Sequence, residues 1–65
     1  MPARIVFVGG DSINVEEDVE EALTGIRVDD FASFELRGDI KRRVYVRRDA
    51  VAYVEQPADV ELGTF

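Results

Sequence analysis

Residues 31–48 read F-A-S-F-E-L-R-G-D-I-K-R-R-V-Y-V-R-R, and this stretch decides the fold. From position 32 to position 37, apolar residues alternate with polar or charged ones. Such alternation predicts a strand over 31–37 that packs one face on a core and exposes the other to water. The apolar residues are Ala32, Phe34 and Leu36. A turn at Gly38-Asp39 is expected to lead into a second strand over 41–48.

The second strand is strongly basic, since five of the eight residues in K-R-R-V-Y-V-R-R are cationic although the chain has a net charge of -6. Its parity places Val44 and Val46 on one face with Arg42 and Arg48. If the valines face the core, the residues Arg43, Tyr45 and Arg47 form a solvent-facing stripe. Two arginines that flank an aromatic residue can hold phosphates and stack a base. The candidate residues for binding a partner or an anion are Arg37, Arg43, Tyr45 and Arg47.

Other roles for these arginines stay open. They can pair across strands with Glu35 and Glu55, or with acids of a second subunit. Arginines on an edge strand also discourage unwanted pairing with other strands. Domains that bind nucleic acid usually have a basic overall balance, which this chain lacks. The sequence therefore favours the carboxylates of a protein partner as the ligands of these arginines. An anion or single-stranded nucleic acid is the alternative ligand.

The N-terminal part predicts a hairpin. Residues 3–8, A-R-I-V-F-V, are apolar on both parities apart from the arginine, which suits a central strand buried on both faces. Gly9-Gly10 predicts a two-residue turn, because glycine adopts positive φ without steric cost. A short return strand over 11–15 should place its isoleucine and valine on one face.

A single helix is expected over 16–24. Its predicted apolar stripe has helical spacing and consists of Val19, Ala22, Leu23 and Ile26. Carboxylates at 16–18 would lie in the first turn, where they stabilise the helix dipole. Asn14 is a possible N-cap in combination with Glu17, and Gly25 is a stop signal.

The acidic side chains of this segment form a second candidate partner surface. They could imitate a row of phosphates and occupy a basic groove of another protein, so an acidic nucleic-acid mimic is a further alternative function. The simpler interpretation is a solvated helix face. The residues concerned are Glu16, Glu17, Glu20 and Glu21.

The remaining sequence predicts a bend at 47–49, a last strand over 50–55 and an end to that strand at Pro57. Residues 1–57 would then form one α+β domain, in which one amphipathic helix packs on one face of an antiparallel sheet of about five strands in the order ββαβββ. Residues 58–65, A-D-V-E-L-G-T-F, alternate weakly and are interpreted as a C-terminal tail or docking arm.

Residues 44–55, V-Y-V-R-R-D-A-V-A-Y-V-E, are similar to the ending of a family of small uncharacterised actinobacterial proteins. In that family a strand, a short turn and an A-Y-V-E strand follow a hairpin and an acidic helix. Arg47-Arg48 stands where that family tends to have a proline-containing turn. The resemblance implies a compact α+β fold and carries no activity, cofactor or site residue.

Composition argues against most catalytic and metal chemistry. The sequence has no His and no Cys, so it offers no zinc ligand of the usual kind, no disulfide and no activated nucleophile. We therefore expect no enzyme, no cofactor and no metal site. No apolar run reaches the length of a membrane span, and a cytoplasmic location is expected. A chain of this size without a covalent staple is expected to gain stability from efficient packing or from self-association, and a homodimer is favoured.

Overall fold

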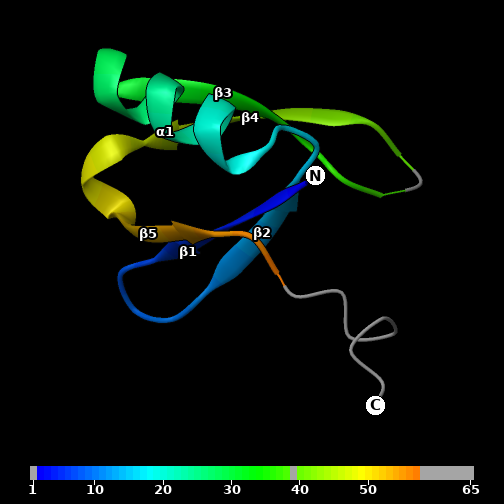
Figure 1. Cartoon of the computed structure of the whole chain (residues 1–65), viewed down its shortest axis with the longest axis horizontal. Coiled ribbons are helices and arrows are strands. Elements are labelled where there is room, and N and C mark those ends of the chain that lie inside the picture. Colours follow the sequence, from blue (N-terminus) through cyan, green and yellow to red (C-terminus); the bar gives the residue numbers. More distant parts are fainter. Residues whose placement is uncertain (1, 39, 58–65) are drawn as a thin grey trace.

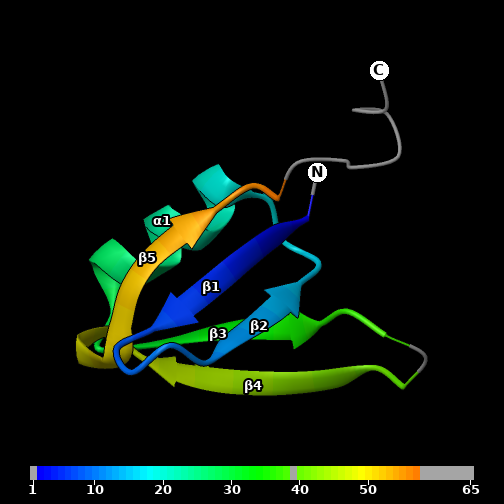
Figure 2. The same ribbon diagram turned by 90° about the horizontal axis from the view of Figure 1, so that it is seen from below.

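The computed structural model describes residues 2–38 and 40–57, and within them five strands and one α-helix follow the predicted order. The sheet is antiparallel throughout, with the strand order β4-β3-β2-β1-β5, and α1 packs against it (Figures 1 and 2). This arrangement confirms the predicted α+β class. The elements are β1 (Ala3–Phe7), β2 (Ser12–Val15), α1 (Val19–Val28), β3 (Phe31–Leu36), β4 (Arg42–Arg47), the 3₁₀ helix η1 (Arg48–Ala50) and β5 (Val51–Glu55).

The sheet is strongly curled, as its connections require. β4 and β5 are its opposite edges, yet the three residues of η1 alone connect them. In a flat sheet these edges would lie about 19 Å apart, which is four spacings of about 4.8 Å. Four residue steps reach at most about 14 Å when extended, and a 3₁₀ turn is shorter still. The predicted bend at 47–49 is thus the turn that joins the two edges.

The sheet folds over along its weakest seam, between β2 and β3. One register pair, Val15 with Leu36, joins these strands. The Glu16 N–H donates to the Glu35 carbonyl oxygen at 2.9 Å, and the Glu17 carboxylate accepts the Glu35 N–H at 3.2 Å. The β3–β4 hairpin can therefore bend away from the three strands β2, β1 and β5 (Figure 2).

The helix begins later than the sequence predicted. Asp18 is its N-cap: the Asp18 carboxylate accepts the Glu21 N–H at 2.8 Å, and the Glu21 carboxylate accepts the Asp18 N–H at 3.1 Å. The predicted start at 16 and the predicted cap at Asn14 are wrong. The physical reason is that the backbone at 16–17 still pairs with neighbouring strands, since the Ala3 N–H donates to the Glu17 carbonyl oxygen at 2.9 Å.

Gly25 lies inside the helix, which corrects its predicted role as a stop signal. Gly25 faces β3 at a distance that leaves room for a methyl group. A methyl group at position 25 would lie 3.6 Å from the Ala32 Cβ and 4.0 Å from the Phe34 Cζ. The helix continues to Val28, and the Asp29 N–H then donates to the Gly25 carbonyl oxygen at 3.3 Å.

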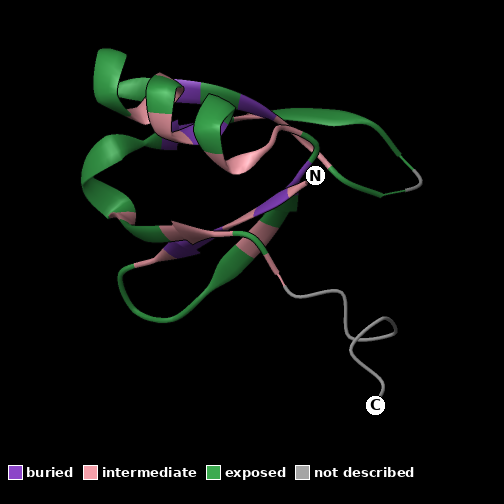
Figure 3. Ribbon diagram, viewed as in Figure 1, coloured by how far each residue is buried: buried purple, intermediate pink, exposed green. Residues whose placement is uncertain are grey.

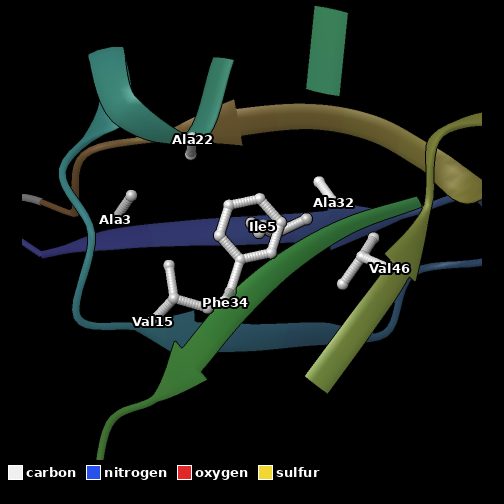
Figure 4. Packing of buried hydrophobic residues seen from close by; sticks show 7 residues of the cluster. All are labelled: Ala3, Ile5, Val15, Ala22, Ala32, Phe34 and Val46. Atoms are coloured by element: carbon white, nitrogen blue, oxygen red, sulfur yellow. The ribbon is translucent and has the colours of Figure 1, made fainter. Parts of the chain in front are cut away.

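The core fills the concave side of the sheet, under the helix (Figures 3 and 4). Phe34 from β3 lies at its centre, beside Ile5 from the central strand (Figure 4). The helix contributes Ala22, with Val19 and Ile26 packed against the cluster. Leu23 is half-buried and lies outside this cluster, so its place in the predicted stripe is corrected. The buried cluster comprises Ala3, Ile5, Val15, Ala22, Ala32, Phe34 and Val46.

Both predicted hairpins form, with longer connections than two residues. Between β1 and β2 the chain turns over residues 8–11, and the Phe7 N–H donates to the Asp11 carbonyl oxygen at 2.8 Å. Gly9 and Gly10 have φ values of 106° and 104°, which explains the glycine pair. Asp39 of the second predicted turn and the predicted arm at 58–65 lie outside the described residues.

Candidate binding surface on strand β4

The basic strand β4 divides its side chains as its parity predicted. Val46 is buried and Val44 is half-buried, whereas Arg43, Tyr45 and Arg47 are all exposed. The Tyr45 side chain is accessible enough to be contacted by a partner, because the residue is 69% exposed. We refer to Arg43, Tyr45 and Arg47 as the Arg–Tyr stripe.

The neighbouring strand β3 supplies the other half of this surface. In the register of the two strands, Ser33 lies opposite Tyr45, and Phe31 lies opposite Arg47. The Arg43 guanidinium donates to the Ser33 hydroxyl at 3.2 Å, which restrains that arginine along the strand pair. The surface thus combines two cations, a central phenol ring and, at one end, Phe31.

The two glutamates that the sequence suggested as partners for the stripe form ion pairs with other cations. Glu35 pairs with Lys41 at 3.5 Å, and Glu55 pairs with Arg4 at 3.1 Å. Within residues 2–38 and 40–57, neither arginine of the stripe forms an ion pair. Glu35 lies opposite Arg43 in the register of the two strands, and its carboxylate is paired with Lys41.

Arg37 lies just beyond the end of β3. Its backbone N–H donates to the Asn14 carbonyl oxygen at 3.0 Å. Together with Arg42 it flanks an open hollow of about 440 Å³, whose apolar lining comes from Leu36 and Ile40. The structure therefore groups Arg37 with Arg42. The sequence reasoning missed Arg42, because its parity assigned it to the core face of the strand.

The backbone of β4 adds a feature that side-chain parity does not show. The Arg48 N–H donates to the Asp30 carbonyl oxygen at 2.8 Å, in the same register as the rest of the β3–β4 pair. Backbone bonding alternates along an antiparallel pair, so the even-numbered residues of β4 bond to β3. Since β4 is an edge strand, the N–H and C=O groups of the Arg–Tyr stripe point to the free edge of the sheet.

The predicted acidic surface is divided by the fold. Glu16 and Glu17 lie in the connection before the helix, whereas Glu20 and Glu21 lie in its first turn. Two of the four carboxylates already have structural partners, because Glu17 accepts the Glu35 N–H and Glu21 completes the capping box. The described residues contain no group of three or more acids that could hold a metal ion.

The fold and this surface define a small α+β domain with a basic edge strand. A comparison of the chain with protein-family models, with curated proteins and with solved structures gives no match. In the part of the chain that the structure describes, no helix combines the length and the apolar character needed to cross a membrane.

Proposed function

We propose that this protein is a non-enzymatic interaction module that binds an acidic segment of a protein partner through the Arg–Tyr stripe. The supporting observation is that Arg43 and Arg47 have no ion pair among the described residues, in a chain with 14 acidic side chains. A homodimer is the proposed form of the protein, and the cytoplasm is its proposed location.

The spacing of the stripe suits an extended partner. Residues two apart on a strand lie about 6.6–6.8 Å from each other on the same face. Arg43 and Arg47 are therefore about 13 Å apart, with Tyr45 between them. A partner segment in extended conformation repeats its side chains at the same interval. Guanidinium groups bind carboxylates in a planar, forked geometry, so acids at alternate positions of that segment would meet them.

Single-stranded nucleic acid is the second candidate, and the exposed Tyr45 favours it. A phenol ring that is 69% exposed between two arginines can stack a base while the cations bind the flanking phosphates. Acidic segments on both sides of the basic hairpin oppose a long nucleic-acid strand. Residues 1–36 carry a net charge of -7 and residues 49–65 a net charge of -4, by count of the sequence.

Fluorescence anisotropy with two labelled probes tests these functions. One probe is an extended peptide of alternating Glu and Thr, and the other is an oligo(dT) strand of similar charge. We expect the peptide to bind at low salt, near 50 mM. The variant Arg43→Gln/Arg47→Gln should weaken this binding by at least about tenfold. Arg27→Gln is the control, since the Arg27 side chain is exposed on α1 and the substitution keeps its carbonyl oxygen, which accepts from Arg48 at 3.5 Å.

The outcomes separate the two candidates. Tighter binding of oligo(dT), weakened by Tyr45→Ala and by rising salt, would replace the protein partner with nucleic acid. Binding of neither probe at low salt would contradict both functions. Equal losses in the stripe variant and in Arg27→Gln would show a general charge effect and would also contradict a site on β4.

A further inference from the structure

The Arg–Tyr stripe presents its side chains on the outer face of the sheet and its backbone groups at the adjoining free edge. The N–H and C=O groups of residues 43, 45 and 47 point to the free edge of the sheet, and their side chains lie on its outer face. An edge strand of this kind can accept a further strand, which adds main-chain hydrogen bonds to any side-chain contacts. The binding mode that this edge allows is therefore strand addition.

The charges of β4 restrict which strand can be added. A second copy of β4 would bring arginines against arginines, and like charges at neighbouring cross-strand positions are destabilising. An acceptable strand needs acids on the parity that meets Arg43 and Arg47. Its other parity should be apolar, because those residues would lie beside Val44 and Val46. Val44 is half-buried and would gain cover from such a neighbour.

The sequence of this chain contains one segment with that pattern, at 58–65. Asp59 and Glu61 share one parity, whereas Val60 and Leu62 share the other. The segment follows Pro57, which has no backbone N–H and therefore cannot continue the ladder of β5. Its alternation and its charge are complementary to those of β4.

We propose that residues 58–62 of a second copy add as a strand to the free edge of β4, and that the two copies exchange these segments reciprocally. One of Asp59 and Glu61 then lies opposite an arginine of the partner's Arg–Tyr stripe, and the other lies opposite Tyr45, within diagonal reach of an arginine. A second copy is favoured over the same chain because β5 ends on the opposite side of the sheet from β4 (Figures 1 and 2). This inference rests on the proposed function and identifies its partner as the protein itself.

Two charge-reversed full-length variants test the exchange by sedimentation velocity. The first is Asp59→Lys/Glu61→Lys, and the second is Arg43→Glu/Arg47→Glu. Each variant alone places like charges at both contacts, so its dimer should dissociate at concentrations at least about tenfold higher than the wild-type dimer. An equimolar mixture should dimerise again, because each basic segment then meets an acidic one. The control Glu16→Lys/Glu20→Lys should dimerise like the wild type.

Other results would overturn the exchange. If the mixture stays monomeric, or if each variant alone dimerises as the wild type does, residues 58–62 do not bind to β4. A dimer that survives tail reversal and is lost on strand reversal would show that another part of the second copy occupies the edge. A wild-type protein that stays monomeric while its stripe still binds the Glu-Thr peptide would contradict the exchange and leave the proposed function intact.

Discussion

At the scale of single residues, Val15 illustrates how few side chains form the core. It is fully buried where β2 meets β3, opposite Ala3 of β1 and in the same cluster as Phe34 (Figure 4). Val15→Ala removes two buried methyl groups, so we expect the free energy of unfolding to fall by about 1.5–3 kcal/mol. Urea denaturation measures this loss. Val28→Ala is the matched control, since Val28 is 71% exposed, and a comparable loss there would contradict the assigned core.

The individual residues also show what the sequence could predict. Alternation identified the core faces of Phe34 and Val46, because a strand has only two faces. It also placed the Arg–Tyr stripe on the outer face. Helical spacing misplaced Leu23, because a helix presents a broad stripe and the contact with the sheet selects only part of it. Which acids pair with which arginines depends on tertiary distances, so the pairing of Glu55 with Arg4 was not foreseen.

At the scale of the elements, the start of α1 is set by one capping residue. Asp18→Ala removes the acceptor for the Glu21 N–H, so the free energy of unfolding should fall by about 0.5–2 kcal/mol. Asn14→Ala, at the cap that the sequence suggested, should cost clearly less. Thermal denaturation of both variants decides between them. A larger loss at Asn14, whose side-chain oxygen accepts from Arg4 at 3.3 Å, would contradict Asp18 as the dominant cap.

Gly25 offers a second test of the helix. The position is helical, and a methyl group there would make an ordinary contact with the Ala32 Cβ at 3.6 Å. Alanine is favoured over glycine inside a helix, so Gly25→Ala should raise the free energy of unfolding by about 0.5–1 kcal/mol. Urea denaturation measures the change. A loss of stability would indicate that α1 lies closer to β3 than these distances state.

The sequence predicted the elements and their order better than their boundaries. Three features compete at the start of α1, namely Asn14, Asp18 and the backbone pairing of residues 16–17, and the pairing becomes visible only in the folded sheet. The predicted stop at Gly25 failed because a single glycine is tolerated inside a helix, so a glycine alone does not fix the helix end.

At the scale of the whole molecule, the curl of the sheet determines which face of β4 is exposed. A three-residue connection joins two opposite edges, and the curl turns the apolar faces inward beneath α1. The basic face of β4 is left outside, at an edge. Strand order follows from pairing choices that no local pattern encodes, so the free edge could not be predicted from the sequence. That edge is where we place the acidic partner.

Mapping of the amide signals by ¹H–¹⁵N NMR during titration with the Glu-Thr peptide tests this placement most directly. Binding along the Arg–Tyr stripe predicts that the largest shifts fall on residues 42–47, with smaller shifts on the facing strand at 31–35. These shifts should disappear in Arg43→Gln/Arg47→Gln and persist in Arg27→Gln. Largest shifts in α1 or β5, or no shifts at low salt, would contradict a carboxylate-binding surface on β4.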